Sequence, residues 1–162
     1  ILNFMDKDVT KVIDADALYF IHTEMAINRT DVLTPHYKEA AQLLNKTVEE
    51  ISNYPLESAL LLNKKYSAMI VLKGPSTVFC NNAKAKFILQ GSPSLSTAGS
   101  GDVLSGIIAG FIAQYGPNED SVINAILVHS LAAKKIDLKY GIGLIASDLL
   151  KAIGHIIKCH TF

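Results

Sequence analysis

Short runs of apolar residues alternate along the chain with longer segments in which apolar residues recur at helical spacing. A short apolar run is typical of a buried strand, and a repeat of three to four residues is typical of an amphipathic helix. The runs predict strands at residues 12–13, 32–33, 69–72, 77–80 and 86–89. The repeats predict helices at residues 17–27, 35–44, 56–66, 103–115, 121–139 and 149–153. This alternation predicts an α/β layer fold.

Local signals refine three of these elements. The sequence Asn81-Asn82-Ala83 between two strands is typical of a hairpin turn, so some antiparallel pairing is expected at one edge of the sheet. Thr34 followed by Pro35 predicts a helix start, with the threonine as the cap. The segment 117–120 ends in two acidic residues and predicts the start of the long helix that follows.

The bulk composition narrows the class of protein. The chain has 162 residues, and 49% of them are hydrophobic, which suffices for one domain with a real core. Its 15 lysines and arginines balance 15 acidic residues, and the charges are scattered, which argues against nucleic-acid binding. The sequence has no apolar run of the roughly 18–20 residues that a membrane span needs. Cys80 and Cys159 lie far apart, so we expect reduced thiols and a cytoplasmic protein.

The strongest chemical signal is the sequence Thr97-Ala98-Gly99-Ser100-Gly101-Asp102 at the start of a predicted helix. Such a loop aligns backbone N–H groups where a helix also offers its unpaired amides, and this forms a cradle for an anion such as a phosphoryl group. Asp102 beside that cradle could accept a proton from a substrate hydroxyl during phosphoryl transfer. The alternative is an ordinary loop in which Asp102 caps the helix.

Five separated segments, taken together, resemble the NAD(P)H-hydrate dehydratases, a branch of the ribokinase-like superfamily. The resemblance covers residues 12–153 and implies a three-layer α/β/α fold with a mostly parallel central sheet. The segments are Asp14-Ala15-Asp16-Ala17-Leu18, Leu33-Thr34-Pro35-His36, Leu72-Lys73-Gly74-Pro75-Ser76-Thr77, residues 97–110 and Gly143-Leu144-Ile145-Ala146-Ser147-Asp148-Leu149.

The same resemblance carries an expectation about the extent of the domain. The chain starts at Ile1 in the middle of a pattern, without an initiator methionine. We therefore expect residues 1–153 to be the C-terminal part of a single ribokinase-like dehydratase domain, followed by a frayed tail at 154–162. The N-terminal part of the domain is expected to be missing, and in some members an epimerase domain precedes it. We also expect a homo-oligomer.

Members of this family restore hydrated NADH or NADPH by phosphorylating the ring hydroxyl with ADP or ATP and eliminating phosphate. By resemblance, Asp102 would be the catalytic base and would contact the hydrated cofactor, while Gly99, Ser100 and Gly101 would form the anion hole. The phosphoryl donor implies Mg²⁺. Asp14 and Asp16 could bind that metal or cap the next helix, so the metal ligands stay unassigned.

The resemblance also points to nucleotide and substrate contacts. The nucleotide site would comprise Lys73, Gly74, Pro75, Ser76, Thr77 and Gly101, although a Lys-Gly-Pro turn is also common at protein surfaces. His36 would contact the hydrated cofactor, and this role is favoured over the alternative that local hydrogen bonds alone satisfy the histidine. His129 lies within a predicted helix, where packing is the favoured role. Tyr19 stands where the family usually has asparagine, which puts that polar contact in doubt.

Two other functions compete with this one. A ribokinase-like kinase of a small alcohol, such as a vitamin precursor or sugar, would use the same glycine and aspartate chemistry but release a stable phosphorylated product. A nucleotide-binding remnant would bind adenylate without turnover. The Leu-Thr-Pro-His and Lys-Gly-Pro-Ser-Thr segments favour the dehydratase.

Overall fold

A computed structural model describes residues 9–21, 26–88, 92–141 and 143–159. The chain divides into two compact units, Ile1–Phe87 and Ile88–Phe162. The first unit holds the β-sheet and is called the sheet unit below. The second consists of helices and is called the helical unit.

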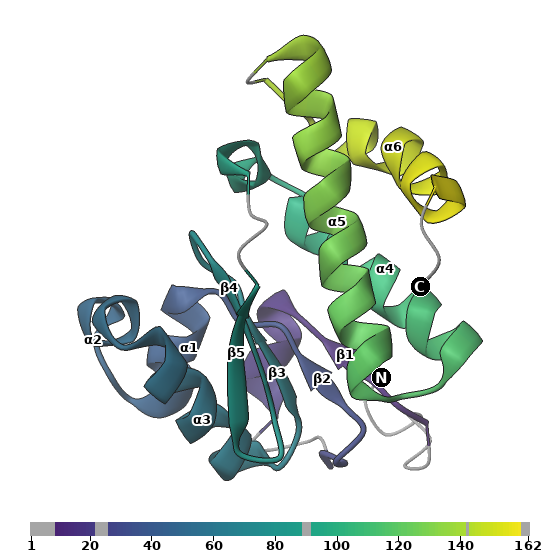
Figure 1. Ribbon diagram of the computed structural model, residues 1–162. Helices are drawn as coiled ribbons and strands as arrows, with labels where there is room; N and C mark the ends of the chain where they lie inside the picture. The colour runs from purple at the N-terminus through teal and green to yellow at the C-terminus, as the bar shows by residue number, and fades with distance from the viewer. Residues whose placement is uncertain (1–8, 22–25, 89–91, 142, 160–162) are drawn as a thin grey trace. The chain divides into compact units, whose positions relative to one another are not determined.

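The sheet has five strands in the order β1-β2-β3-β4-β5 (Figure 1). The first three strands are parallel, and β4 runs antiparallel to β3. The predicted hairpin is confirmed, because β4 and β5 are joined by Asn82 and Ala83, both with positive φ, as a tight hairpin turn requires. The strands are β1 (Val12–Ile13), β2 (Val32–Leu33), β3 (Met69–Leu72), β4 (Thr77–Asn81) and β5 (Lys84–Ile88).

Helices α1 (Tyr37–Leu44), α2 (Val48–Asn53) and α3 (Pro55–Tyr66) lie together on one side of the sheet (Figure 1). Alternate residues of the strands contribute to the core beneath them, because successive side chains of a strand point to opposite faces. The strand residues of this core are Ile13, Leu33, Ile70, Leu72, Val78 and Cys80.

Several predictions for the sheet unit are wrong in detail. The helix predicted at 17–27 is the 3-10 helix η2 (Ala15–Phe20). Its buried residue Leu18 and the buried C-cap residue Ile21 are three positions apart, which fits the tighter 3-10 repeat. Residues 26–28 are not helical, and residues 22–25 lie outside the described part. Helix α2 was not predicted, although a capping box of Thr47 and Glu50 marks its start. Thr34 does not cap α1; it is buried, and its hydroxyl donates to the Ile13 carbonyl.

The helical unit contains η3 (Pro93–Ser96), α4 (Ser100–Tyr115), α5 (Glu119–Tyr140) and α6 (Ala146–Cys159). Helix α5 packs against both α4 and α6 (Figure 1). The predicted start of α5 is confirmed, because the Asn118 side chain accepts a hydrogen bond from the Ser121 N–H. None of the helices in the described ranges is long and apolar enough to cross a membrane.

Helix α6 is longer than predicted. Residues 154–159, expected to fray, continue the helix, because Ile156 is buried one turn beyond the buried Ala152. Residues 160–162 of the expected tail lie outside the described part.

Candidate active site

The carboxyl ends of β1, β2 and β3 meet at one edge of the sheet because these three strands are parallel. In open α/β sheets this edge is where ligands bind. His36 and Lys73, which follow β2 and β3, form a parallel β-bridge there, and the Lys73 N–H donates to the Pro35 carbonyl at 2.8 Å. The structure therefore brings two predicted site residues side by side in the sheet unit.

Asp14, which follows β1, forms an ion pair with Lys73 at this edge. The Lys73 Nζ donates to the Asp14 Oδ1 at 2.5 Å, and the two side chains are 20% and 14% exposed. Within the described residues, the Asp14 side chain does not cap η2. Of the two roles left open for Asp14, capping is therefore excluded, and its carboxylate instead holds the lysine expected to bind nucleotide.

Gly74 allows a close approach between the turn after β3 and the start of α1. A Cβ atom on Gly74 would lie 2.4 Å from the Tyr37 Oη, so the tyrosine ring lies directly against the glycine. Burial raises the pKa of the Tyr37 hydroxyl above its usual value. Sequence reasoning missed Tyr37, because the preceding Leu-Thr-Pro-His segment drew attention to the histidine alone.

We expect Gly74→Ala to displace the Tyr37 ring and the turn, because no Cβ atom fits at 2.4 Å. Overpacking of this kind typically costs about 1–3 kcal/mol, and a displaced turn should also weaken nucleotide binding. Thermal unfolding and an ADP titration measure the two effects. The double variant Gly74→Ala/Tyr37→Ala should recover the binding; if it does not, the contact with Tyr37 is not the reason for the glycine.

His36 is the N-cap of α1. Its Nδ1 accepts from the Glu39 N–H at 3.1 Å, and the Glu39 Oε2 accepts from the His36 N–H at 2.7 Å. The His36 Nε2 lies 3.4 Å from the Glu39 Oε1, and the His36 side chain is 50% exposed. The local hydrogen bonds considered from the sequence are therefore present. They orient the ring while leaving half of the side chain accessible at the sheet edge.

The glycine loop of the helical unit forms the start of α4. Gly99 is the N-cap with φ +83°, a conformation that favours glycine. Gly101 and Asp102 follow as the second and third helical residues, where backbone N–H groups have no intrahelical partner. A Cβ on Gly99 would lie 3.1 Å from the Ala146 Cβ, so the start of α6 closely borders the loop. This arrangement has the amide geometry of an anion cradle.

Asp102 does not cap α4, because Gly99 occupies that position. The capping alternative is therefore wrong. Asp102 is exposed in the first helical turn, and its carboxylate forms no hydrogen bond or ion pair with any residue that the structure describes. A carboxylate here is favoured by the helix dipole and is accessible to a substrate.

The first turn of α4 is anchored from two sides. The Ser100 Oγ donates to the Leu95 carbonyl at 2.6 Å, and the His129 Nε2 lies 3.0 Å from the Ser100 carbonyl. Burial lowers the pKa of His129 to about 4, so its ring is neutral near pH 7 and donates from Nε2. The packing role predicted for His129 is confirmed, and the hydrogen bond to Ser100 adds a contact to the cradle itself.

The described residues contain no group of three or more His, Cys, Asp or Glu side chains that could hold a metal ion. Asp16 is exposed in the first turn of η2, and Asp14 is engaged by Lys73. Mg²⁺ usually takes only one or two carboxylates and completes its shell with phosphate oxygens and water. The residues present therefore fit a metal held mainly by a nucleotide, with few protein ligands.

The fold places the chain in a broad class. A ribokinase-like superfamily protein from Enterococcus faecalis V583 superposes with a TM-score of 0.82 and 26% identity, over 97% of this chain and 55% of that protein. The chain is thus a ribokinase-like α/β protein, as the sequence predicts.

Sequence comparison then defines the family. The chain belongs to the NAD(P)H-hydrate dehydratase family, whose model matches residues 1–155. The bifunctional NAD(P)H-hydrate repair enzyme Nnr of Vibrio cholerae is 37% identical over 93% of this chain and 31% of its own length. The ADP/ATP-dependent NAD(P)H-hydrate dehydratase of Bacillus subtilis, co-crystallized with ATP/Mg²⁺ and soaked with CoA, superposes with a TM-score of 0.83. It is 25% identical over 94% of this chain and 57% of that enzyme. The chain thus spans between about a third and just over half of these proteins.

Proposed function

We propose that the complete protein is an ADP- or ATP-dependent NAD(P)H-hydrate dehydratase. The observation that carries the proposal is the start of α4, where an accessible Asp102 stands in the first helical turn beside backbone N–H groups, those of Gly101 and Asp102, that have no intrahelical partner. The Ser100 N–H already donates to the Thr97 carbonyl. The hydroxyl of the hydrated nicotinamide ring would attack the terminal phosphoryl group of ADP or ATP and lose its proton, and AMP or ADP would leave. Elimination of inorganic phosphate, with loss of a proton from the adjacent ring carbon, would then give NADH or NADPH.

Some residues of this chain would bind the nucleotide that donates the phosphoryl group, and others would act on the hydrated NADH or NADPH. Asp102 would accept the proton of the attacking hydroxyl, and the amides around Gly99, Ser100 and Gly101 would stabilise charge on the transferred phosphoryl group. The ammonium group of Lys73 would donate hydrogen bonds to the nucleotide phosphates instead of to the Asp14 carboxylate. His36, oriented by Glu39, would contact the hydrated cofactor. The nucleotide site would also take in Gly74, Pro75, Ser76 and Thr77, and Mg²⁺, when bound with the nucleotide, would neutralise phosphate charge.

A direct assay separates this function from its competitors. The complete protein is given hydrated NADH with ADP or ATP, and the absorbance of the reduced nicotinamide ring is followed. Recovery that depends on nucleotide supports the dehydratase. A stable phosphorylated product without recovery would indicate a small-alcohol kinase. Nucleotide binding without either product would indicate a binding module.

Nucleotide binding is expected to stabilise the complete protein. A ligand present at 100 times its Kd adds about 2.7 kcal/mol to the free energy of unfolding, so saturating ADP or ATP should raise the melting temperature measurably. Lys73→Met should lessen this shift, whereas Lys64→Met, on the exposed surface of α3, should not. An unchanged melting temperature at saturating ADP and ATP would contradict the nucleotide site.

The homo-oligomer and the cytoplasmic location stay predictions. Analytical ultracentrifugation of the complete protein tests the oligomeric state.

A further inference from the structure

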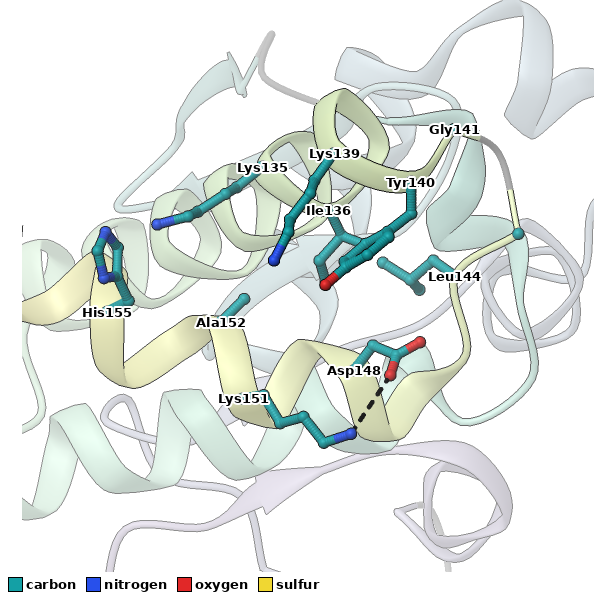
Figure 2. A pocket seen from close by; sticks show the side chains of 11 residues that line it. Lys135, Ile136, Lys139, Tyr140, Gly141, Leu144, Asp148, Lys151, Ala152 and His155 are labelled. Carbon is teal, nitrogen blue, oxygen red and sulfur yellow. Dashed lines mark ion pairs between the residues drawn. The ribbon is translucent and has the colours of Figure 1, made fainter.

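A pocket of about 470 Å³ lies within the helical unit, between the end of α5 and the first turns of α6 (Figure 2). Its floor is apolar and buried, formed by Ile136, Leu144 and Ala152, which are 7%, 5% and 9% exposed. Small-molecule sites usually measure about 300–1,000 Å³ and combine an apolar lining with a few polar groups. The pocket has the size and the floor of such a site.

The rim of the pocket is cationic. Lys135 and Lys139, one helical turn apart on α5, lie opposite α6, which contributes His155 and Lys151 to the lining. The Lys139 side chain points into the space between the helices, whereas the Lys151 side chain is directed toward Asp148 (Figure 2). Asp148 is the only acidic residue among the described lining residues, and it is already 3.8 Å from the Lys151 Nζ. Lys135 and Lys139 form no ion pair with any described residue.

Helix chemistry accounts for only part of this arrangement. A lysine near the end of α5 favours the negative end of the helix dipole, which explains Lys139. Lysines four residues apart on one helix repel each other, and Lys151 belongs to the middle of another helix. An anion seated among these groups would relieve the repulsion.

Tyr140 adds an aromatic surface beside the lysines. Tyr140 is 72% exposed, and the Lys139 Nζ lies 4.8 Å from the centre of its ring. A flat ring can stack on such a tyrosine while charged groups of the same ligand reach the ammonium groups. The pocket therefore suits a small molecule with both an anionic and a flat apolar part.

We propose that this pocket binds a small organic phosphate, in which an aromatic or other flat group lies on Tyr140 and the apolar floor while the phosphate contacts Lys135 and Lys139. The lining residues include none of the glycine loop and none of the Lys73 turn. Binding at this pocket does not rest on the proposed dehydratase activity.

Phenyl phosphate is a suitable probe, and binding to the complete protein can be followed by NMR. We expect it to shift the amide signals of Gly141, Gly143 and Leu144, and to bind at least tenfold more tightly than inorganic phosphate or phenol. Because both phosphate contacts are charge-assisted, Lys135→Gln/Lys139→Gln should weaken binding by at least tenfold. Lys134→Gln, an exposed neighbour outside the pocket, is the matched control and should change binding less than twofold.

Three results would overturn the proposal. The first is that phenyl phosphate does not bind. The second is that only the amide signals of Gly101 and Asp102 change when it is added. The third is that Lys134→Gln weakens phenyl phosphate binding as much as Lys135→Gln/Lys139→Gln does. Unchanged melting temperatures establish that the lysine variants are folded. Because the probe contains neither a nucleotide nor a nicotinamide ring, failure here would leave the dehydratase activity unaffected, and loss of that activity would leave this site unaffected.

Discussion

Asp102→Asn is expected to lower the turnover of hydrated NADH by roughly 10²–10⁴-fold, the usual effect of removing general acid–base help. The amide keeps the size of the carboxylate but cannot accept the hydroxyl proton. Nucleotide affinity should change little or improve, because a negative charge near the phosphates is removed. Steady-state assays of recovered reduced nicotinamide, together with an ADP titration, measure both quantities.

The structure supplies a matched control for this variant. Asp120 is also an exposed acidic residue in the first turn of a helix, α5, so Asp120→Asn removes the same helix-dipole contribution without touching the glycine loop. Asp120→Asn should retain turnover. Near-normal turnover of Asp102→Asn would exclude both the base and the phosphoryl-transfer mechanism, because Gly99 already excludes a capping role for the aspartate.

The second large effect is a dependence of stability on pH that originates at His129. Its pKa is lowered by burial from 6.5 to about 4 in the folded protein. Below pH 6.5 the unfolded chain takes up a proton at this residue and the folded protein does not, so the free energy of unfolding falls as the pH falls. Across the window from pH 6.5 to 4 the loss from this group is about 3 kcal/mol, at 1.36 kcal/mol for each unit of pKa difference.

Denaturant unfolding at a series of pH values tests this dependence. His129→Gln keeps a side-chain N–H donor for the Ser100 carbonyl but cannot titrate, so its stability should fall less steeply between pH 6.5 and 4. Equal slopes for the parent protein and His129→Gln would contradict the assignment.

The sheet and most helices could be predicted because their signals are local. The apolar run of β3 and the turn residues Asn82 and Ala83 each determine structure within a few positions. The helix at 17–27 was overestimated because apolar spacing alone does not separate a 3-10 turn from an α-helix. The short α2 escaped prediction because its six residues contain too little periodicity, although its cap was visible.

In the candidate site, too, the features encoded by consecutive residues could be predicted, and the contacts between distant residues could not. The glycine loop could be found because its chemistry lies in consecutive residues. The contact of Asp14 with Lys73 joins residues 59 positions apart, and it follows only from the parallel order of β1, β2 and β3. Tyr37 against Gly74 likewise depends on where α1 begins relative to the turn after β3. No local pattern carries such information.

The pairing of Lys73 with Asp14 also affects how a charged ligand approaches the sheet edge. Two opposite charges 2.5 Å apart produce a dipolar field, which falls off faster with distance than the field of a lone lysine. Ions screen what remains within about 8 Å at physiological salt. This pair therefore contributes little to the long-range attraction of nucleotides, and correspondingly little to the dependence of their association rate on ionic strength.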